Sequence, residues 1–311
     1  MLVLVLALAF VAAGDHDRSL TVGGATRTYL VHLPPRFSER GPLPVVVAFH
    51  GGGGNSTGFK AYARLDALAD REGFVVVYPD GSGRVGRRLL TWNAGSCCGG
   101  ALTQNVDDVG FAVAVLRDLA RELALDPARV YATGHSNGAM MAYRLAIDAS
   151  ERIAAIATVA GMMVSSHFPP KRPVPVLHIH SVDDPRAVYT GGLGPPFPGT
   201  SNRVQHSPVE SGLRRWAAFD GCPAEPRAAE HREGTRRRET GHTATLLVWA
   251  PCAPGVEVAF WKLTVAGHGW PGGKTPLPVE LIGPNTRVIN AADEIWAFLR
   301  RFTRQDAPAL H

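Results

Sequence analysis

Short apolar runs alternate with amphipathic stretches along most of the chain. The runs are rich in Val, Ile and Phe and predict six strands, at residues 44–49, 74–78, 130–133, 153–159, 174–179 and 256–265. A strand that is buried on both faces is apolar throughout rather than alternating. These runs therefore favour the interior of a parallel sheet.

Apolar residues recur at helical spacing between the predicted strands. This spacing predicts helices at residues 59–71, 107–123, 139–148 and 291–301. Alternating strands and helices are typical of an α/β fold with right-handed crossovers. We expect a mostly parallel, doubly wound sheet with helices on both faces.

The remaining segments are turns and loops. The stretch "RSLTVGGATRTYLVHLPP" alternates around Gly23 and Gly24 and predicts an opening hairpin. Gly- and Pro-rich loops occupy residues 81–100, 191–208 and 267–285. In doubly wound sheets the loops at the carboxyl ends of the strands build the functional site.

The N-terminus carries an apolar run at residues 2–13, followed by small residues and then by charge. The run is too short to span a bilayer, and it fits a signal peptide over residues 1–14. No basic residues precede it, which leaves open a start further upstream; a buried strand is the alternative. We expect a secreted protein, extracellular or periplasmic, with one domain over residues 15–305.

Composition narrows the function classes. Of 311 residues 45% are hydrophobic and 19% charged, which is typical of a globular protein. The net charge of +5 derives partly from residues 227–239, which we interpret as a solvated loop. Nucleic-acid binding would need basic residues along a helix or among aromatics, and neither pattern occurs. No membrane partner is indicated either.

The four cysteines do not have the spacing of a metal site, and no HExxH motif occurs. These patterns give no indication of a metal site. In an oxidising compartment, Cys222 and Cys252 can form a disulfide across the charged stretch. The adjacent Cys97 and Cys98 can form a vicinal disulfide or remain thiols.

The strongest chemical signal is "GHSNG", residues 134–138, between a predicted strand and a predicted helix. This context is typical of a nucleophile elbow, in which a strained turn presents a serine at a helix N-terminus. Gly134 and Gly138 would leave room for the tight turn. We interpret Ser136 as a nucleophile; the alternative is a serine that only caps the helix.

A serine nucleophile needs a base and an orienting acid, which follow it in chain order in this fold. His268 follows the last predicted strand in a Gly-rich loop and is the predicted base. Asp183 and Asp184 follow another strand. Either can orient the imidazole.

The other histidines have simpler interpretations. His178 and His180 alternate within a strand, where they would pack or form structural hydrogen bonds. His135 could line the site, with its side chain directed away from the serine. Three more lie in polar loops and are expected to contact solvent: His167, His206 and His242.

The stretch "HGGGGNSTGF" follows the first central strand and exposes backbone N–H groups. We expect the N–H groups of Gly52 and Asn137 to form an oxyanion hole. Phosphate binding is the rival interpretation, but Lys60 is displaced from the position that a P-loop requires.

Seven segments occur in order and carry a family resemblance: "FHGGGGN", "YPDG", "TWNAGSCCGGA", "NVDDVGF", "GHSNGAMMAYRLA", "YTGG" and "GHGWPGG". Together, over residues 21–302, the chain resembles the polyhydroxybutyrate depolymerase family of secreted esterases, which includes feruloyl and acetylxylan esterases. The resemblance implies an α/β-hydrolase fold and a Ser-Asp-His triad that needs neither a metal nor a cofactor.

Carried over to this sequence, the resemblance implies Ser136 as nucleophile and His268 as base. The position of Tyr189 in the family's Y-x-G-G segment points to Asp184 as the acid. This chain has Ser181 where the family has glycine, so Asp183 stays an alternative. Residues 194–208 are unusual in their Gly and Pro content and are expected at the pocket rim.

Two tryptophans flank the expected site loops. Trp92 and Trp270 are predicted to stack on an aromatic acyl group or a sugar ring, or else to anchor the loops. Asp107 and Asp108 are interpreted as caps of the helix that follows.

The sequence therefore predicts a serine esterase acting on small or oligomeric esters: feruloyl or acetyl esters of plant polysaccharides, or short polyhydroxyalkanoates. A peptidase, a lipase and a non-catalytic binding protein on the same fold stay open. The sequence does not determine the oligomeric state.

Overall fold

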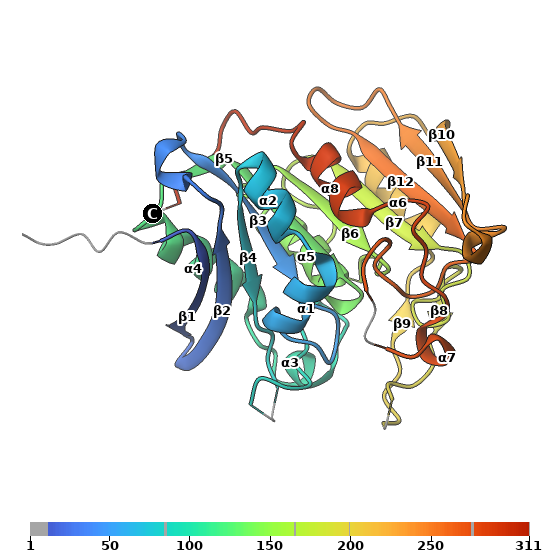
Figure 1. Ribbon diagram of the computed structural model, residues 1–311, viewed down its shortest axis with the longest axis horizontal. Coiled ribbons are helices and arrows are strands. Elements are labelled where there is room, and N and C mark those ends of the chain that lie inside the picture. Colours follow the sequence, from blue (N-terminus) through green and yellow to red (C-terminus); the bar gives the residue numbers. More distant parts are fainter. Residues whose placement is uncertain (1–11, 84–85, 165, 199, 275–276, 311) are drawn as a thin grey trace, which may run out of the picture.

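A ten-stranded sheet runs through the molecule (Figure 1). The computed structural model describes residues 12–83, 86–164, 166–198, 200–274 and 277–310. The strand order in the sheet is β1-β2-β4-β3-β5-β6-β7-β12-β11-β10. Crossovers between non-consecutive neighbours, as in β4-β3-β5, are those of a doubly wound α/β sheet.

The centre of the sheet is parallel and its edges are antiparallel. The parallel strands are β4 (Val75–Pro79), β3 (Leu43–Phe49), β5 (Leu125–His135), β6 (Ala155–Val159), β7 (Val176–Ser181) and β12 (Val258–Thr264). The antiparallel edges are β1 (Gly14–Val22) and β2 (Ala25–Leu33) on one side, and β11 (Thr243–Trp249) and β10 (Arg227–Glu233) on the other. All six predicted strands are confirmed, and so is the opening hairpin.

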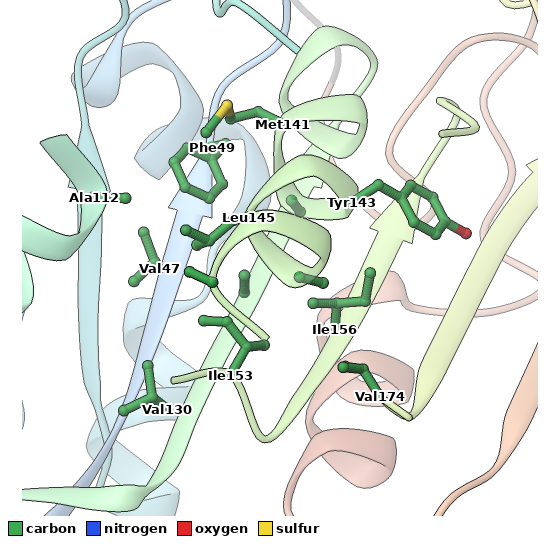
Figure 2. Packing of buried hydrophobic residues seen from close by; sticks show 14 of the residues in the cluster. Val47, Phe49, Ala112, Val130, Met141, Tyr143, Leu145, Ile153, Ile156 and Val174 are labelled. Carbon is green, nitrogen blue, oxygen red and sulfur yellow. The ribbon is translucent and has the colours of Figure 1, made fainter. Parts of the chain in front are cut away.

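Helices cover both faces, as predicted. Apolar side chains of α1 (Ser56–Ala63), α2 (Asp66–Glu72) and α8 (Ala291–Leu299) pack on one face, and Figure 1 shows these helices together. Those of α4 (Asp108–Ala120), α5 (Asn137–Asp148) and α6 (Val209–Phe219) pack on the other. Figure 2 shows Met141 and Leu145 of α5 beside Val47 and Phe49 of β3.

The predicted helix at residues 59–71 is two helices. Arg64 ends α1 in the left-handed region, with φ of 56°, and α2 begins at Asp66. The apolar spacing continues across the break because both helices pack on the same face of the sheet. Spacing alone therefore did not reveal the interruption. The helix α6 was not predicted.

The solvated loop expected at residues 227–239 is wrong in part. Residues 227–233 form β10, an edge strand whose side chains are mostly exposed and which pairs with β11. Charged side chains on both faces of β10 make it resemble a loop in the sequence. Backbone pairing with β11 and the contacts of Arg232 with Glu294 and Trp261 hold the strand in place.

The remaining elements lie in the connections. They are the 3₁₀ turns η1 (Phe37–Glu39) and η2 (Arg237–Glu239), the short helices α3 (Gly99–Thr103) and α7 (Val279–Ile282), and the two-residue strands β8 (Gly192–Leu193) and β9 (Gln205–His206). Disulfides join Cys222 to Cys252 and Cys97 to Cys98. Within the described ranges, no helix combines the length and apolarity needed to cross a bilayer. The apolar run at residues 2–13 lies almost wholly outside those ranges.

Candidate active site

A sharp turn between β5 and α5 presents Ser136. Its backbone has φ of 57° and ψ of −121°, an unfavourable conformation for a residue with a Cβ. A side chain at Gly134 would collide with the backbone of Gly138, and one at Gly138 with the backbone of Phe49. The two glycines therefore permit the close packing that holds the serine in this strained position.

Ser136, His268 and Asp184 form one hydrogen-bonded series across the ends of three strands. Nε2 of His268 lies 2.8 Å from Oγ of Ser136, and its Nδ1 lies 2.8 Å from Oδ2 of Asp184. A carboxylate only accepts hydrogen bonds, so Nδ1 carries the proton and Nε2 is free to accept from the serine. This is the arrangement of a base between a nucleophile and an orienting acid.

The two adjacent aspartates, Asp183 and Asp184, differ in burial and in their hydrogen-bond partners. The carboxylate of Asp184 is buried, and its Oδ1 accepts the N–H groups of Arg186 and Ala187 at 2.7 and 2.8 Å. Asp183 is exposed and accepts the N–H of Val265 at 2.7 Å. Only Asp184 reaches His268.

Burial by itself would raise the pKa of Asp184. The neighbouring imidazole of His268 and the hydrogen bonds to its carboxylate favour the charged form more strongly, and the pKa falls to about 2. The carboxylate is therefore ionised at any pH near neutral.

The strand β7 contributes a second series of hydrogen bonds, through His178 and His180. Nε2 of His180 lies 2.8 Å from the carbonyl oxygen of Ala187, so this nitrogen carries a proton. Its Nδ1 then accepts from Nε2 of His178 at 3.1 Å, and Nδ1 of His178 accepts from Thr158 at 2.8 Å. Burial lowers the pKa of both histidines. The interpretation of this pair as structural fits these contacts.

The other predicted histidines differ in their surroundings. His135 and His206 both line the pocket, and burial lowers the pKa of His135 to about 3 and that of His206 to about 4. His167 bonds Asp148 at 2.9 Å and keeps an exposed side chain. The solvent-exposed position expected for His242 is wrong, because the turn after η2 folds back and leaves it 5% exposed.

The N–H groups of Gly52 and Asn137 border the same space. A Cβ placed on Gly52 would lie 3.6 Å from Cβ of Asn137, so the two residues adjoin. Among the described residues neither N–H has an acceptor, whereas the next two glycines donate to Leu90 and Gly51. Asn137 opens α5, where the helix dipole also favours negative charge.

These groups open into a pocket of about 450 Å³. All three Gly- and Pro-rich loops contribute to it, as the sequence predicts. Its apolar wall holds Phe59, Tyr62, Leu89, Met140, Pro195, Phe197, Pro198, Val204, Leu277, Leu281 and Ile282. Such a wall suits an apolar group larger than a methyl.

The predicted stacking role of Trp92 and Trp270 is not supported, because both side chains are 0% exposed. Trp92 donates its indole N–H to the carbonyl of His50 at 2.9 Å, and Trp270 packs edge-on against Phe59. These contacts fit the alternative, in which the two rings anchor the loops. They cannot touch a substrate in this conformation.

The paired aspartates of "NVDDVGF" lie at the start of α4 and have different contacts. Asp107 caps α4 by accepting the N–H of Gly110 at 2.8 Å, as predicted. Asp108 is instead buried and pairs with Arg27 at 2.7 Å. It therefore anchors β2 to α4 rather than capping the helix.

Sequence reasoning missed two side chains of the pocket. The ring of Phe197 lies over Gly52, within 2.8 Å of where a Cβ would be, and Arg186 lies beside it. The unusual composition of residues 194–208 placed that segment at the rim, but no local pattern singled out a side chain.

Comparison with known proteins gives consistent matches. The family model described as "Esterase PHB depolymerase" matches residues 27–218. "Putative esterase NocK" of Nocardia uniformis subsp. tsuyamanensis is 32% identical over 91% of this chain and 81% of its own length.

Two further relatives are much longer than the part they share with this chain. The bifunctional acetylxylan esterase/xylanase XynS20E of Neocallimastix patriciarum is 28% identical, over 79% of this chain and 31% of its own length. Feruloyl esterase B of Piromyces equi is 26% identical, over 80% of this chain and 44% of its own length.

Among solved structures, the acetyl xylan esterase from Aspergillus awamori matches with a TM-score of 0.60. The match covers 92% of this chain and 99% of the other, at 14% sequence identity. At this identity the match concerns the fold, which is that of the α/β-hydrolases.

Proposed function

The chain belongs to the esterase PHB depolymerase family of carboxylic ester hydrolases, and we propose that it is a serine esterase acting through Ser136, His268 and Asp184. The observation that carries this proposal is the series of two 2.8 Å contacts from Oγ of Ser136 through His268 to Asp184, beside a pocket.

In the first step Oγ of Ser136 attacks the ester carbonyl carbon. Nε2 of His268 takes the hydroxyl proton as the bond forms, since an unassisted serine is a poor nucleophile. The carbonyl oxygen becomes an oxyanion, and the N–H groups of Gly52 and Asn137 hydrogen-bond to it. The ring of Phe197 lies over Gly52 and would reduce the access of water to this donor.

The intermediate then collapses and the alcohol leaves. His268 gives its proton to the departing oxygen, which leaves an ester between the acyl group and Ser136. The same imidazole takes a proton from water as the water oxygen attacks the acyl carbon. It then gives this proton to Oγ of Ser136 as the bond between serine and acyl carbon breaks and the acid is released. Asp184 holds the imidazole in the required tautomer and stabilises the imidazolium in both halves.

The pocket and the relatives bear on the substrate. A mostly apolar wall and a volume of about 450 Å³ suit an aromatic or medium-length acyl group. Relatives named as feruloyl and acetylxylan esterases support feruloyl or acetyl esters of plant polysaccharides. Short polyhydroxyalkanoate esters fit the family and are the other class that we propose.

We also propose that the protein is exported and that residues 15–305 form one catalytic domain. The apolar run at residues 2–13 and the two disulfides support export. One continuous sheet from β1 to β10 supports a single domain.

Replacing the nucleophile tests the function. We expect Ser136→Ala to abolish hydrolysis of methyl ferulate, aryl acetates and hydroxybutyrate oligomers, and to abolish labelling by a fluorophosphonate probe. The control is Ser201→Ala, which removes an exposed serine of the rim and should leave labelling intact. Full labelling and turnover in Ser136→Ala would refute the proposal.

A further inference from the structure

One charged side chain stands out among the residues around the pocket. The described lining contains no Asp, Glu or Lys, and its one permanently charged member is Arg186. A guanidinium keeps its charge at every physiological pH. In a mostly apolar wall, such a group is the natural counterpart of a substrate anion.

Two contacts fix the position of Arg186. Its backbone N–H donates to Asp184, so the turn that holds the acid also sets the start of this side chain. At the other end, Nη2 donates to the carbonyl oxygen of Pro196 at 3.0 Å, and the guanidinium carbon lies 6.0 Å from the ring centre of Phe197. The charge is thereby held at the pocket rim.

The guanidinium has unused hydrogen-bonding capacity. It carries five N–H donors, and the contact to Pro196 is its one side-chain hydrogen bond among the described residues. Within those residues no carboxylate lies within 4.0 Å of it, because Asp184 is directed to His268 and to backbone N–H groups. Partial burial lowers the pKa of Arg186, and the charge of Asp184 opposes this shift.

We propose that Arg186 is a specificity-determining residue that binds a carboxylate carried by the ester substrate. This inference rests on the proposed esterase function and narrows its substrates to anionic esters. The carboxylate can belong to the acyl part, as in a monoester of a dicarboxylic acid, or to the alcohol. Both share one chemistry, which is a planar anion paired with the guanidinium.

Matched esters test the inference. For the acyl part, mono-p-nitrophenyl glutarate is compared with p-nitrophenyl pentanoate; for the alcohol, 4-acetoxybenzoate is compared with 4-acetoxybenzamide. Each pair gives a ratio of kcat/KM values, anionic over neutral. We expect Arg186→Met to lower the ratio of one pair by roughly 10- to 100-fold, the usual effect of losing a charged hydrogen bond.

Two further variants control the result. Arg203→Met removes the same charge from an exposed position of the rim segment and should keep the wild-type ratios. Arg186→Lys retains the charge and should restore part of the lost ratio. The inference would be overturned if Arg186→Met lowered kcat/KM equally for both esters of each pair, or if neither ratio changed. Arg186 would then only support the rim.

The neutral esters allow the test of Arg186 to be distinguished from the test of the esterase function. Their turnover by the wild type, together with labelling at Ser136, reports on the esterase proposal. The ratios report on Arg186 alone. If the wild type hydrolyses the neutral esters and Arg186→Met shows the same kcat/KM ratios as the wild type, only the anionic-substrate inference is refuted.

Discussion

At the scale of single residues, two adjacent aspartates have opposite environments. Asp184 is buried and contacts His268, whereas Asp183 is exposed and accepts a backbone N–H from Val265. Both residues lie in the turn that follows β7, and their carboxylates contact different residues of the loop after β12. The pair therefore provides a matched test of the orienting acid.

We expect Asp184→Asn to lower kcat by roughly 10⁴-fold, because an amide favours the wrong tautomer of His268. Asp183→Asn should lower it less than about tenfold, since that carboxylate only supports the backbone of Val265. The measurement is kcat on an aryl ester for both variants. Similar losses in the two would contradict the assignment of the acid.

The burial of Asp220 makes the free energy of unfolding depend on pH. It is fully buried at the end of α6, and burial raises the pKa of its carboxyl to about 8 from the ordinary value of 3.8. Between these values the folded protein holds a proton that the unfolded chain has lost. The free energy of unfolding therefore decreases as pH rises from about 4 to about 8, by at most about 1.4 kcal/mol per pH unit.

We expect Asp220→Asn to remove most of this decrease, because an amide does not titrate. Urea denaturation at pH 5 and pH 8 measures it: the wild type should lose more stability between the two than the variant does. An identical change in both proteins would show that Asp220 is not the group responsible.

At the scale of elements, backbone pairing and cross-links hold segments that local pattern does not predict. The edge strand β10 has mostly exposed side chains and depends on its pairing with β11. The disulfide between Cys222 and Cys252 joins the end of α6 to the connection between β11 and β12. The cross-link thus closes a loop that contains the whole β10–β11 hairpin.

Replacing both cysteines with serine should lower the free energy of unfolding by about 2–4 kcal/mol, through the entropy of the opened loop in the unfolded chain. Urea denaturation with and without reductant measures the effect, and the variant should no longer respond to reductant at this cross-link. Activity of the folded variant should persist, because neither cysteine lines the pocket. A stability equal to that of the wild type would contradict this role.

At the scale of the whole molecule, the site depends on segments far apart in the sequence. The proposed nucleophile, acid and base follow β5, β7 and β12, whose carboxyl ends lie at one edge of the parallel sheet. The rim around Phe197 comes from the connection between β7 and α6. One rigid sheet therefore positions the reacting groups, and loops shape the pocket around them.

The proposed signal peptide can be tested on the whole chain. Because β1 begins at Gly14, we expect a chain that lacks residues 1–13 to keep its urea midpoint and its kcat/KM. Expressed in a bacterium, the full chain should reach the periplasm and the shortened one should remain inside. Fractionation and activity assays measure both, and export of the shortened chain would contradict the assignment.

Much of the fold and part of the site followed from local pattern. Unbroken apolar runs predicted the buried parallel strands, because only a strand covered on both faces is apolar throughout. The strand–turn–helix context of Gly134 and Gly138 singled out Ser136, since a turn this tight excludes a Cβ. His268 stood out because it follows the last strand among glycines.

Tertiary structure alone decided the features that depend on distant neighbours. The contact of Asp184 rather than Asp183 with His268 and the burial of Trp92 each depend on packing against segments remote in the chain. The same holds for Phe197 and Arg186 at the pocket. A sequence pattern records which face of its own element a residue occupies, but not which side chain from elsewhere meets it there; that is determined only when the sheet brings the loops together.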